Sequence, residues 1–240
     1  MPPGDFSNMF DFPAINMAAA HNMFIQGINA MVYHAPHITP EQVLPFMLFC
    51  QATFSNIHHH HDIEEEYYFG ALENKLGKGV LTPNTDEHKL FVPKLGEFEN
   101  YLKDITSGKE KYDGNLIIER IHSFSDTMIM HLNHEIPTIS SSRLKEHFTE
   151  KELHDIDKKF MELAFANIDF YIALPIAVGC ANPATPWFPP FPLPLRWATR
   201  LWFSRKHRKS WEFCPLDLSG KPRPWYNEAA GITETSTASK

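Results

Sequence analysis

The stretch HHHHDIEEEYYF, residues 58–69, places four consecutive histidines directly before three glutamates in the interior of the chain. Imidazole nitrogen and carboxylate oxygen are ligands for iron, manganese and zinc, so the stretch is a candidate wall of a metal site. Two pairs with a spacing of four, His60–Glu64 and His61–Glu65, would each lie on one helix face. The apolar residues before them do not decide between the pairs. At most two of the four histidines can point inward.

A second pair with the same spacing, His131 and Glu135, occurs in MHLNHEIP. Two more histidines, His21 in AAAHNMF and His88 in DEHKLFV, occupy apolar positions of other predicted helices. A buried carboxylate without a partner is costly, and metal coordination is one of the few arrangements that stabilises it. Steps of three and four back from Glu135 give a core-facing series, so this pair is predicted to point inward: His131, Met128, Phe124, Ile121 and Ile117.

Apolar residues recur at helical spacing in five segments, and no segment shows the sustained alternation typical of strands. The segments cover residues 14–34, 40–76, 85–106, 115–134 and 143–174. Short connections favour antiparallel neighbours. The pattern therefore predicts an all-α fold, an up-down-up-down four-helix bundle with an extra C-terminal helix laid against it.

Prolines and aromatic residues dominate NPATPWFPPFPLPLRW, residues 182–197, where we expect an ordered strap across the bundle and no regular helix. The predicted organisation has three parts. Residues 14–139 form a metal-binding bundle, and residues 140–228 form a C-terminal helix and a Pro/aromatic-rich extension packed on it. Residues 229–240 form a disordered tail.

The composition excludes some classes of protein. With a net charge of −7 and scattered basic residues, the chain offers no broad nucleic-acid surface. The most apolar window, FANIDFYIALPIAVGCA, is short and contains Asp169 and Pro175, so we expect no integral membrane segment. Three cysteines without framework spacing and a start without a secretory signal predict a cytoplasmic protein.

The four motifs occur in the order of the successive helices of a known family. HNMFIQGINAMVYHAPHI, HHHHDIEEEYYF, EHKLFVPKLGEFENYL and HLNHEIPTI resemble the hemerythrin-like (HHE cation-binding) family, particularly its fungal members. The resemblance covers about residues 14–139, and WFPPFP and WEFCPLDLSGKPRP resemble the extension of such fungal proteins. It implies a non-haem di-iron centre inside the bundle and favours the pair His60–Glu64. The implied ligands are His21, His60, Glu64, His88, His131 and Glu135.

One position departs from the family pattern. Many relatives carry a second histidine four residues after the first on the third helix, but this chain has Val92 there. The resemblance therefore implies that one ligand is missing and that an apolar side chain takes its place. Other histidines could substitute, although His134 lies off the face of His131 and Glu135: His34, His37, His122 and His134.

The implied cofactor is iron, as a pair of ions, with zinc or manganese as alternatives. Three functions stay open at this point. The protein could bind dioxygen, act as an iron-dependent oxidase or oxygenase on a small organic metabolite in a fungal biosynthetic pathway, or be a metal-binding or sensing module without catalysis. Dioxygen and a small organic substrate are the expected partners. The sequence identifies no catalytic residue, but the apolar position of Val92 favours an activating site over a carrier.

Overall fold

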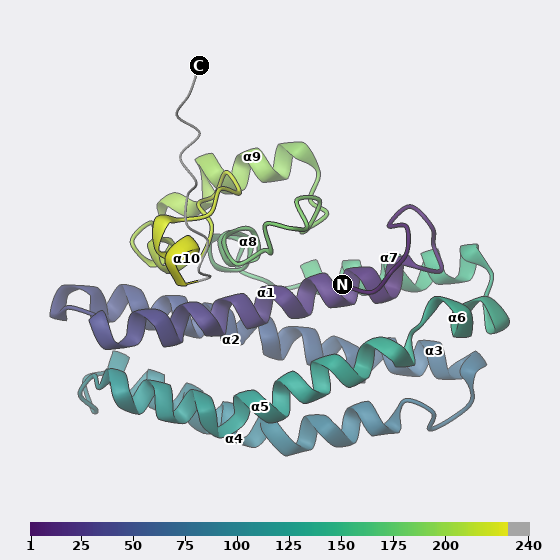
Figure 1. Ribbon diagram of the computed structural model, residues 1–240, viewed down its shortest axis with the longest axis horizontal. Coiled ribbons are helices and arrows are strands. Elements are labelled where there is room, and N and C mark those ends of the chain that lie inside the picture. Colours follow the sequence, from purple (N-terminus) through teal and green to yellow (C-terminus); the bar gives the residue numbers. More distant parts are fainter. Residues whose placement is uncertain (230–240) are drawn as a thin grey trace.

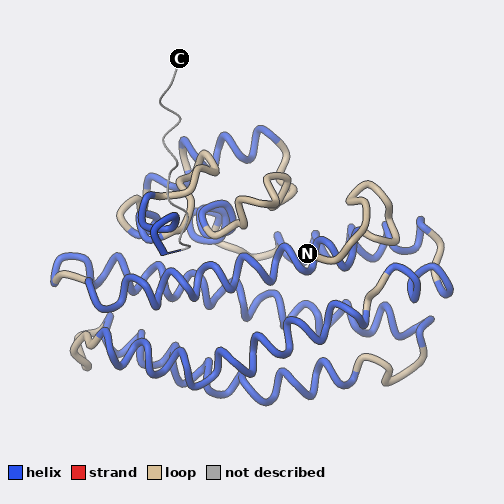
Figure 2. Tube along the Cα trace, in the orientation of Figure 1, coloured by secondary structure: helices blue, strands red, loops and turns tan. Residues whose placement is uncertain are grey.

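Four long helices form the main body of the computed structural model, which describes residues 1–229 and contains no β-sheet within them (Figures 1 and 2). They are α1 (Phe12–His34), α2 (Val43–Ile63), α4 (Thr82–Thr106) and α5 (Gly114–Thr138). A π-helical turn, Glu64–Tyr68, continues α2 into α3 (Phe69–Leu76). Successive long helices run in opposite directions (Figure 1). Helices α1 and α4 each pack against α2 and α5, so the predicted up-down-up-down bundle is confirmed.

The predicted helix 143–174 is three shorter helices, α6 (Ser141–His147), α7 (Glu150–Phe165) and α8 (Phe170–Gly179). Two local signals cause the breaks. Thr149 and Glu152 form a capping box that starts α7. Asn167 has a positive φ of 60°, which ends the preceding helical path, and the Asp169 carboxylate then accepts a hydrogen bond from the backbone N–H of Tyr171 at the start of α8.

The chain after α8 forms an extension that lies along one side of the bundle beside α1 and α2 (Figure 1). The expectation of no regular helix in residues 182–197 was wrong at its end, because α9 (Leu193–Leu201) begins there. Pro194 lies in its first turn, where no backbone N–H is needed. The last described helix is α10 (Pro224–Ala229). Apart from residue 229, the predicted disordered tail lies outside the described residues.

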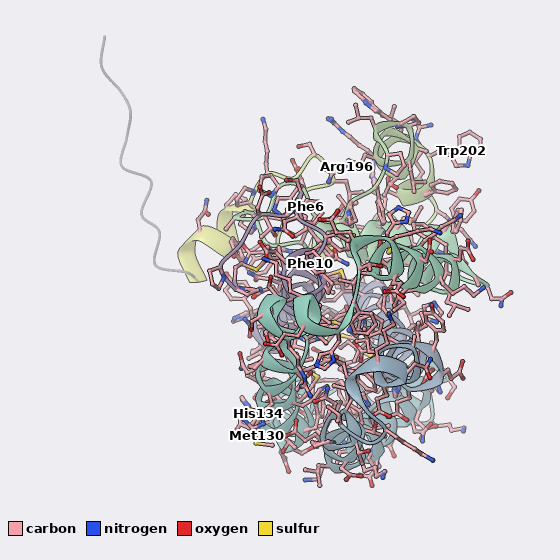
Figure 3. All side chains as sticks on the ribbon, turned by 90° about the vertical axis from the view of Figure 1, so that its right-hand side faces the viewer. Phe6, Phe10, Met130, His134, Arg196 and Trp202 are labelled. Carbon is pink, nitrogen blue, oxygen red and sulfur yellow. The ribbon has the colours of Figure 1, made fainter. Side chains whose placement is uncertain are left out.

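The strap before α9 is held by side chains at both of its surfaces. Phe188 is buried against the main apolar core. On the other side Arg196, labelled in Figure 3, donates hydrogen bonds to the backbone carbonyl oxygens of Pro186, Trp187 and Pro189. None of the helices in residues 1–229 has the length and apolar character needed to cross a membrane.

Two apolar clusters fill the interior. The larger contains Phe54, Phe91 and Met128, and the smaller contains Tyr68 and Leu72. A set of buried polar side chains lies at the border of the two clusters: His21, His61, Glu64, His88, His131 and Glu135. Because buried charges and imidazoles need partners, this border is the place in the bundle where a site is expected.

Candidate metal centre

The polar border of the core forms two groups of donor atoms. His21, His60 and Glu64 offer one ligand atom each within 4.8 Å of one another, and the second group, with the same spacing, is formed by His61, His88 and His131. The first group comes from α1, α2 and the π-helical turn, and the second from α2, α4 and α5. Each group can hold one ion.

Two buried carboxylates lie between the groups. One oxygen of Glu64 is 2.7 Å from Nε2 of His60, and its other oxygen is 3.9 Å from Nε2 of His88. Oε2 of Glu135 is 3.2 Å from Nε2 of His21 and 3.8 Å from Nε2 of His131. Each carboxylate therefore approaches both groups, which is the placement that a ligand bridging two cations requires.

Hydrogen bonds orient three of the imidazoles. His21, His88 and His131 each have Nδ1 next to an atom that can only accept, so Nδ1 carries the proton and Nε2 presents its lone pair to the site. The acceptors are the carbonyl oxygen of Leu132 at 3.0 Å, Oε1 of Glu65 at 2.6 Å and Oε2 of Glu87 at 3.2 Å, respectively.

The donor atoms fit a cation better than they fit one another. Nε2 of His88 lies 2.9 Å from Nε2 of His131, and with both Nδ1 atoms protonated two lone pairs face each other at this distance. Among the described residues, Nε2 of His21, His60 and His61 and all four oxygens of Glu64 and Glu135 have no hydrogen-bond partner. The short nitrogen–oxygen distances given above lack hydrogen-bond geometry, so these atoms are better matched by metal ions than by protons.

The electrostatics prepare the same atoms for metal binding. Burial, reinforced by the neighbouring imidazoles, lowers the pKa of His60 and His61 well below the ordinary histidine value, so both are neutral at pH 7. Burial and the nearby Glu135 raise the pKa of Glu64 well above its ordinary value. Metal ligands must be neutral histidines and ionised carboxylates, and a cation between Glu64 and Glu135 would relieve their repulsion.

The six residues implied by the resemblance all lie at this border, and His61 joins them as a seventh. The resemblance singled out His60, but adjacent residues on a helix point about 100° apart and can face two neighbouring groups. The two adjacent histidines, His60 and His61, were the feature of the sequence that could have revealed one ligand for each group. Glu65, which the sequence pattern pairs with His61, belongs to neither group of donors. Its side chain is 43% exposed and accepts the hydrogen bond from His88.

Val92 of α4 was expected to take the place of a missing ligand. Val92 is half-buried at the edge of the main core. Phe91 instead packs beside the second group, with its ring centre 5.4 Å from that of His61 and 5.5 Å from that of His131. The second group thus has three histidines, with His61 of α2 as the third, and Val92 is not part of it.

The other candidate substitutes lie elsewhere. His34 packs against Phe213 and Trp225 of the extension. His37 and His122 are exposed. The side chain of His134 is 58% exposed, lies at the edge of the bundle in Figure 3 and donates to Glu87.

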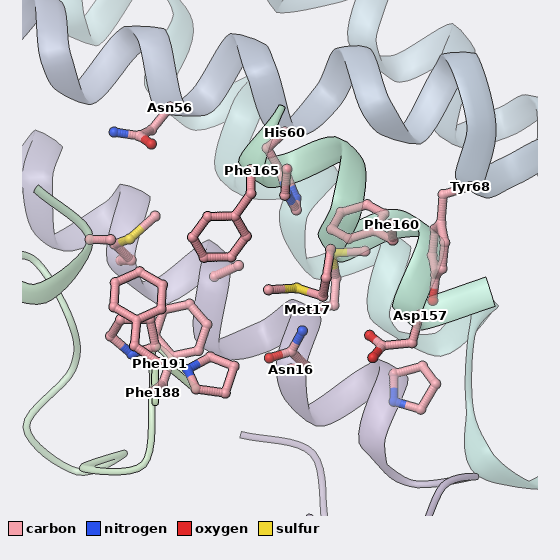
Figure 4. A pocket seen from close by; sticks show the side chains of 18 of the residues that line it. Asn16, Met17, Asn56, His60, Tyr68, Asp157, Phe160, Phe165, Phe188 and Phe191 are labelled. Carbon is pink, nitrogen blue, oxygen red and sulfur yellow. The ribbon is translucent and has the colours of Figure 1, made fainter. Parts of the chain in front are cut away.

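An apolar cavity of about 160 Å³ reaches the centre from the side of the extension and ends at His60 (Figure 4). Its walls come from α1, α2, α7, α8 and the strap, so bundle and extension build it together. Most of the lining is apolar, including Phe160, Phe165, Phe188 and Phe191. A few polar side chains interrupt the apolar wall: Asn16, Asn56, Tyr68 and Asp157.

Asp157 is expected to destabilise the fold at neutral pH. Burial raises the pKa of its carboxyl to about 6, against a smaller opposing effect of His154. Between the ordinary pKa of 3.8 and about 6, the folded protein holds a proton that the unfolded chain has released. The free energy of unfolding therefore falls as pH rises through this window. We expect Asp157→Leu to raise it at pH 7 by about 1–2 kcal/mol, a figure reduced for solvent screening.

Urea unfolding of both proteins at pH 4 and pH 7 measures this effect. The gain from Asp157→Leu should be larger at pH 7 than at pH 4, and Asp155→Leu, at an exposed position of the same helix, is the matched control. An equal gain at both pH values would show that the carboxyl of Asp157 is not perturbed.

Comparison with known proteins agrees with the all-helical fold and with a cation-binding domain. The model of the hemerythrin HHE cation-binding domain matches residues 14–136. The dimeric xanthone biosynthesis cluster protein R11 of Cryptosporiopsis sp. (strain 8999) is 32% identical over 228 residues, which cover 88% of this chain and 81% of that protein. F-box/LRR-repeat protein 5 of Bos taurus is 31% identical over 109 residues, 45% of this chain and 15% of that protein. No solved structure matches the chain significantly. The chain belongs to the hemerythrin HHE cation-binding domain family.

Proposed function

We propose that the chain holds a pair of iron ions in this centre and reacts with dioxygen. The observation that carries the proposal is the position of Glu64 and Glu135, each of which approaches both groups of histidines. Five imidazoles with two carboxylates are a donor set that suits iron, with zinc and manganese as competitors. Bound iron would supply the electrons that reduce dioxygen.

The chain's own residues would hold, orient and shield the ions. His21, His60 and Glu64 would bind one, and His61, His88 and His131 the other, with Glu135 reaching both. Glu65 and Glu87 keep Nε2 of His88 and His131 directed inward through their Nδ1 hydrogen bonds. Aromatic side chains exclude water: Phe24 lies 5.0 Å from the ring of His60, and Phe91 lies 5.4 Å from that of His61. A dry site strengthens each electrostatic contact inside it.

Oxidation of a small organic molecule is a second candidate function, favoured by the cavity. The cavity ends at His60, which belongs to the group with only two histidines, so a molecule held there lies against the half of the centre with fewer nitrogen donors. A carrier or a sensor of metal has no need of such a cavity. The name of the fungal relative refers to a biosynthesis cluster, which is compatible with an oxidase or oxygenase of a small metabolite.

Metal analysis and optical spectroscopy test the proposed function. The protein expressed in iron-supplemented medium should contain about two iron ions per chain. After anaerobic reduction, admission of air should change its visible spectrum within the mixing time or shortly after it. Protein that takes up only zinc or manganese under these conditions, or reduced iron protein that air leaves unchanged, would contradict the proposal.

A further inference from the structure

We propose that the cavity beside His60 is a binding site for a phenol, an aromatic ring with a free hydroxyl group, and that Asp157 and Asn16 select for the hydroxyl. That the bound ring is a substrate rests on the proposed function, whereas the binding site rests on the cavity alone.

The size and walls of the cavity fit one aromatic ring. Its volume is about 160 Å³, close to the roughly 150 Å³ of an engineered apolar cavity that holds benzene. Five phenylalanines line it, and aromatic walls favour flat aromatic guests through offset or edge-to-face packing: Phe12, Phe160, Phe165, Phe188 and Phe191. Met17 and Met161 add flexible side chains that adapt to substituents on the ring.

The polar side chains lie together on one part of the wall. Figure 4 shows Asp157 beside Tyr68, with Asn16 next to Met17 on the adjoining wall. Oδ1 of Asn16 is buried without a hydrogen-bond partner among residues 1–229. Over the same residues, neither carboxylate oxygen of Asp157 accepts a hydrogen bond from a protein group. A buried acceptor without a donor is costly, so Asn16 is matched by a guest that donates, and the partly buried carboxylate of Asp157 can accept from the same guest.

A hydroxyl group matches the hydrogen-bonding character of each of these three side chains. It can donate to Asn16 or Asp157 and accept from the O–H of Tyr68. An ammonium group could donate to the same acceptors, but its charge would have to leave water for a cavity whose lining is mostly apolar, which costs more than burying a neutral hydroxyl. A carboxylate would face the like charge of Asp157 at neutral pH. The partly buried carboxyl of Asp157 is also expected to destabilise the fold at neutral pH, so a contribution to binding accounts for its presence better than a structural role does.

The His60 ring closes the opposite part of the wall. One edge of this imidazole faces Glu64, with Nε2 at 2.7 Å from the carboxylate, while the side chain also lines the cavity. A ring anchored by its hydroxyl at Asp157 therefore lies between the polar wall and a residue of the candidate metal centre. The anchor sets which end of the guest points to the metal.

Phenol and toluene are the decisive pair of probes, because they have nearly the same shape and differ in the hydroxyl. Isothermal titration of the full chain as purified, with its metal content recorded, should give at least tenfold tighter binding of phenol. In Asp157→Leu the preference should fall to threefold or less, with toluene binding gained and the thermal transition no lower than that of the parent. Asp155→Leu should keep the parent's preference.

Equal binding of phenol and toluene by the parent, tighter binding of benzylamine than of phenol, or a preference unchanged in folded Asp157→Leu would each overturn the inference. Should that variant fail to fold, Asn16→Leu tests the same wall and should lower the preference for phenol. The two proposals fail separately. Selective phenol binding by protein that takes up no iron would refute the proposed function alone, and iron-replete protein that does not bind phenol would refute this inference alone.

Discussion

Replacing His61 with alanine is expected to lower the iron content from about two ions per chain to about one. His61 is one of three histidines in its group, and its loss leaves only His88 and His131 with the shared carboxylates. Loss of groups that merely orient a ligand costs 10–100-fold in affinity, so loss of a ligand itself should cost at least about 100-fold. The group of His21, His60 and Glu64 is intact in this variant and should keep its ion.

Elemental analysis after gel filtration measures the change. His59→Ala is the matched control, because His59 donates a hydrogen bond to the carbonyl oxygen of Ala164 and belongs to neither group of donors. The double variant His61→Ala/Val92→His asks whether a histidine from α4 can take the same place, and we expect partial recovery of the lost ion. Equal iron in His61→Ala and His59→Ala would show that α2 supplies only one ligand histidine.

Removal of the metal is expected to lower the melting temperature by roughly 10–20 °C. A ligand present at 100 times its dissociation constant stabilises the folded state by about 2.7 kcal/mol, so two ions contribute about 5 kcal/mol. For a protein of this size each kcal/mol corresponds to about 2–4 °C. The physical cause lies in the centre, where Glu64 and Glu135 repel each other and unpaired lone pairs meet.

Calorimetry before and after dialysis against a chelator, and again after iron is restored, measures this dependence. Glu135→Gln separates the causes, because it removes the repulsion together with one bridging ligand. Its metal-free form should melt at or above the metal-free parent, while its melting temperature should respond less to iron. Identical melting temperatures of the parent with and without metal would mean that the centre does not stabilise the fold.

The apolar stripes predicted the bundle because helices with one buried face leave a clear period in the sequence. They placed His131 and Glu135 inward, since α5 is regular from Ile117 to its last turn. They could not choose between His60 and His61, because the π-helical turn that begins at Glu64 changes the period just where the choice is made. Both side chains face the centre, one in each group, so His60 and His61 are both candidate ligands.

Other features had no local signal that spacing could reveal. The break between α7 and α8 depends on a left-handed Asn167, and asparagine tolerates other conformations equally well. The cavity brings Asn16, Asp157 and Phe188 together from three distant parts of the chain. Its existence depends on how the extension packs on the bundle, which a periodic pattern within single helices does not encode.

Because α7 and the strap form one side of the cavity, part of its selectivity, including the contribution of Asp157, lies outside the bundle that carries the donor atoms, whereas Asn16 contributes from α1. Exchange of residues 150–191 for those of a relative would alter which molecule rests against His60, yet none of the seven inward-facing donors lies in that segment. Natural variation in residues 150–191 can therefore change the molecule bound in the cavity while the donor set of the centre stays the same. For protein engineering, the same separation makes residues 150–191 the place to begin when a new guest is wanted.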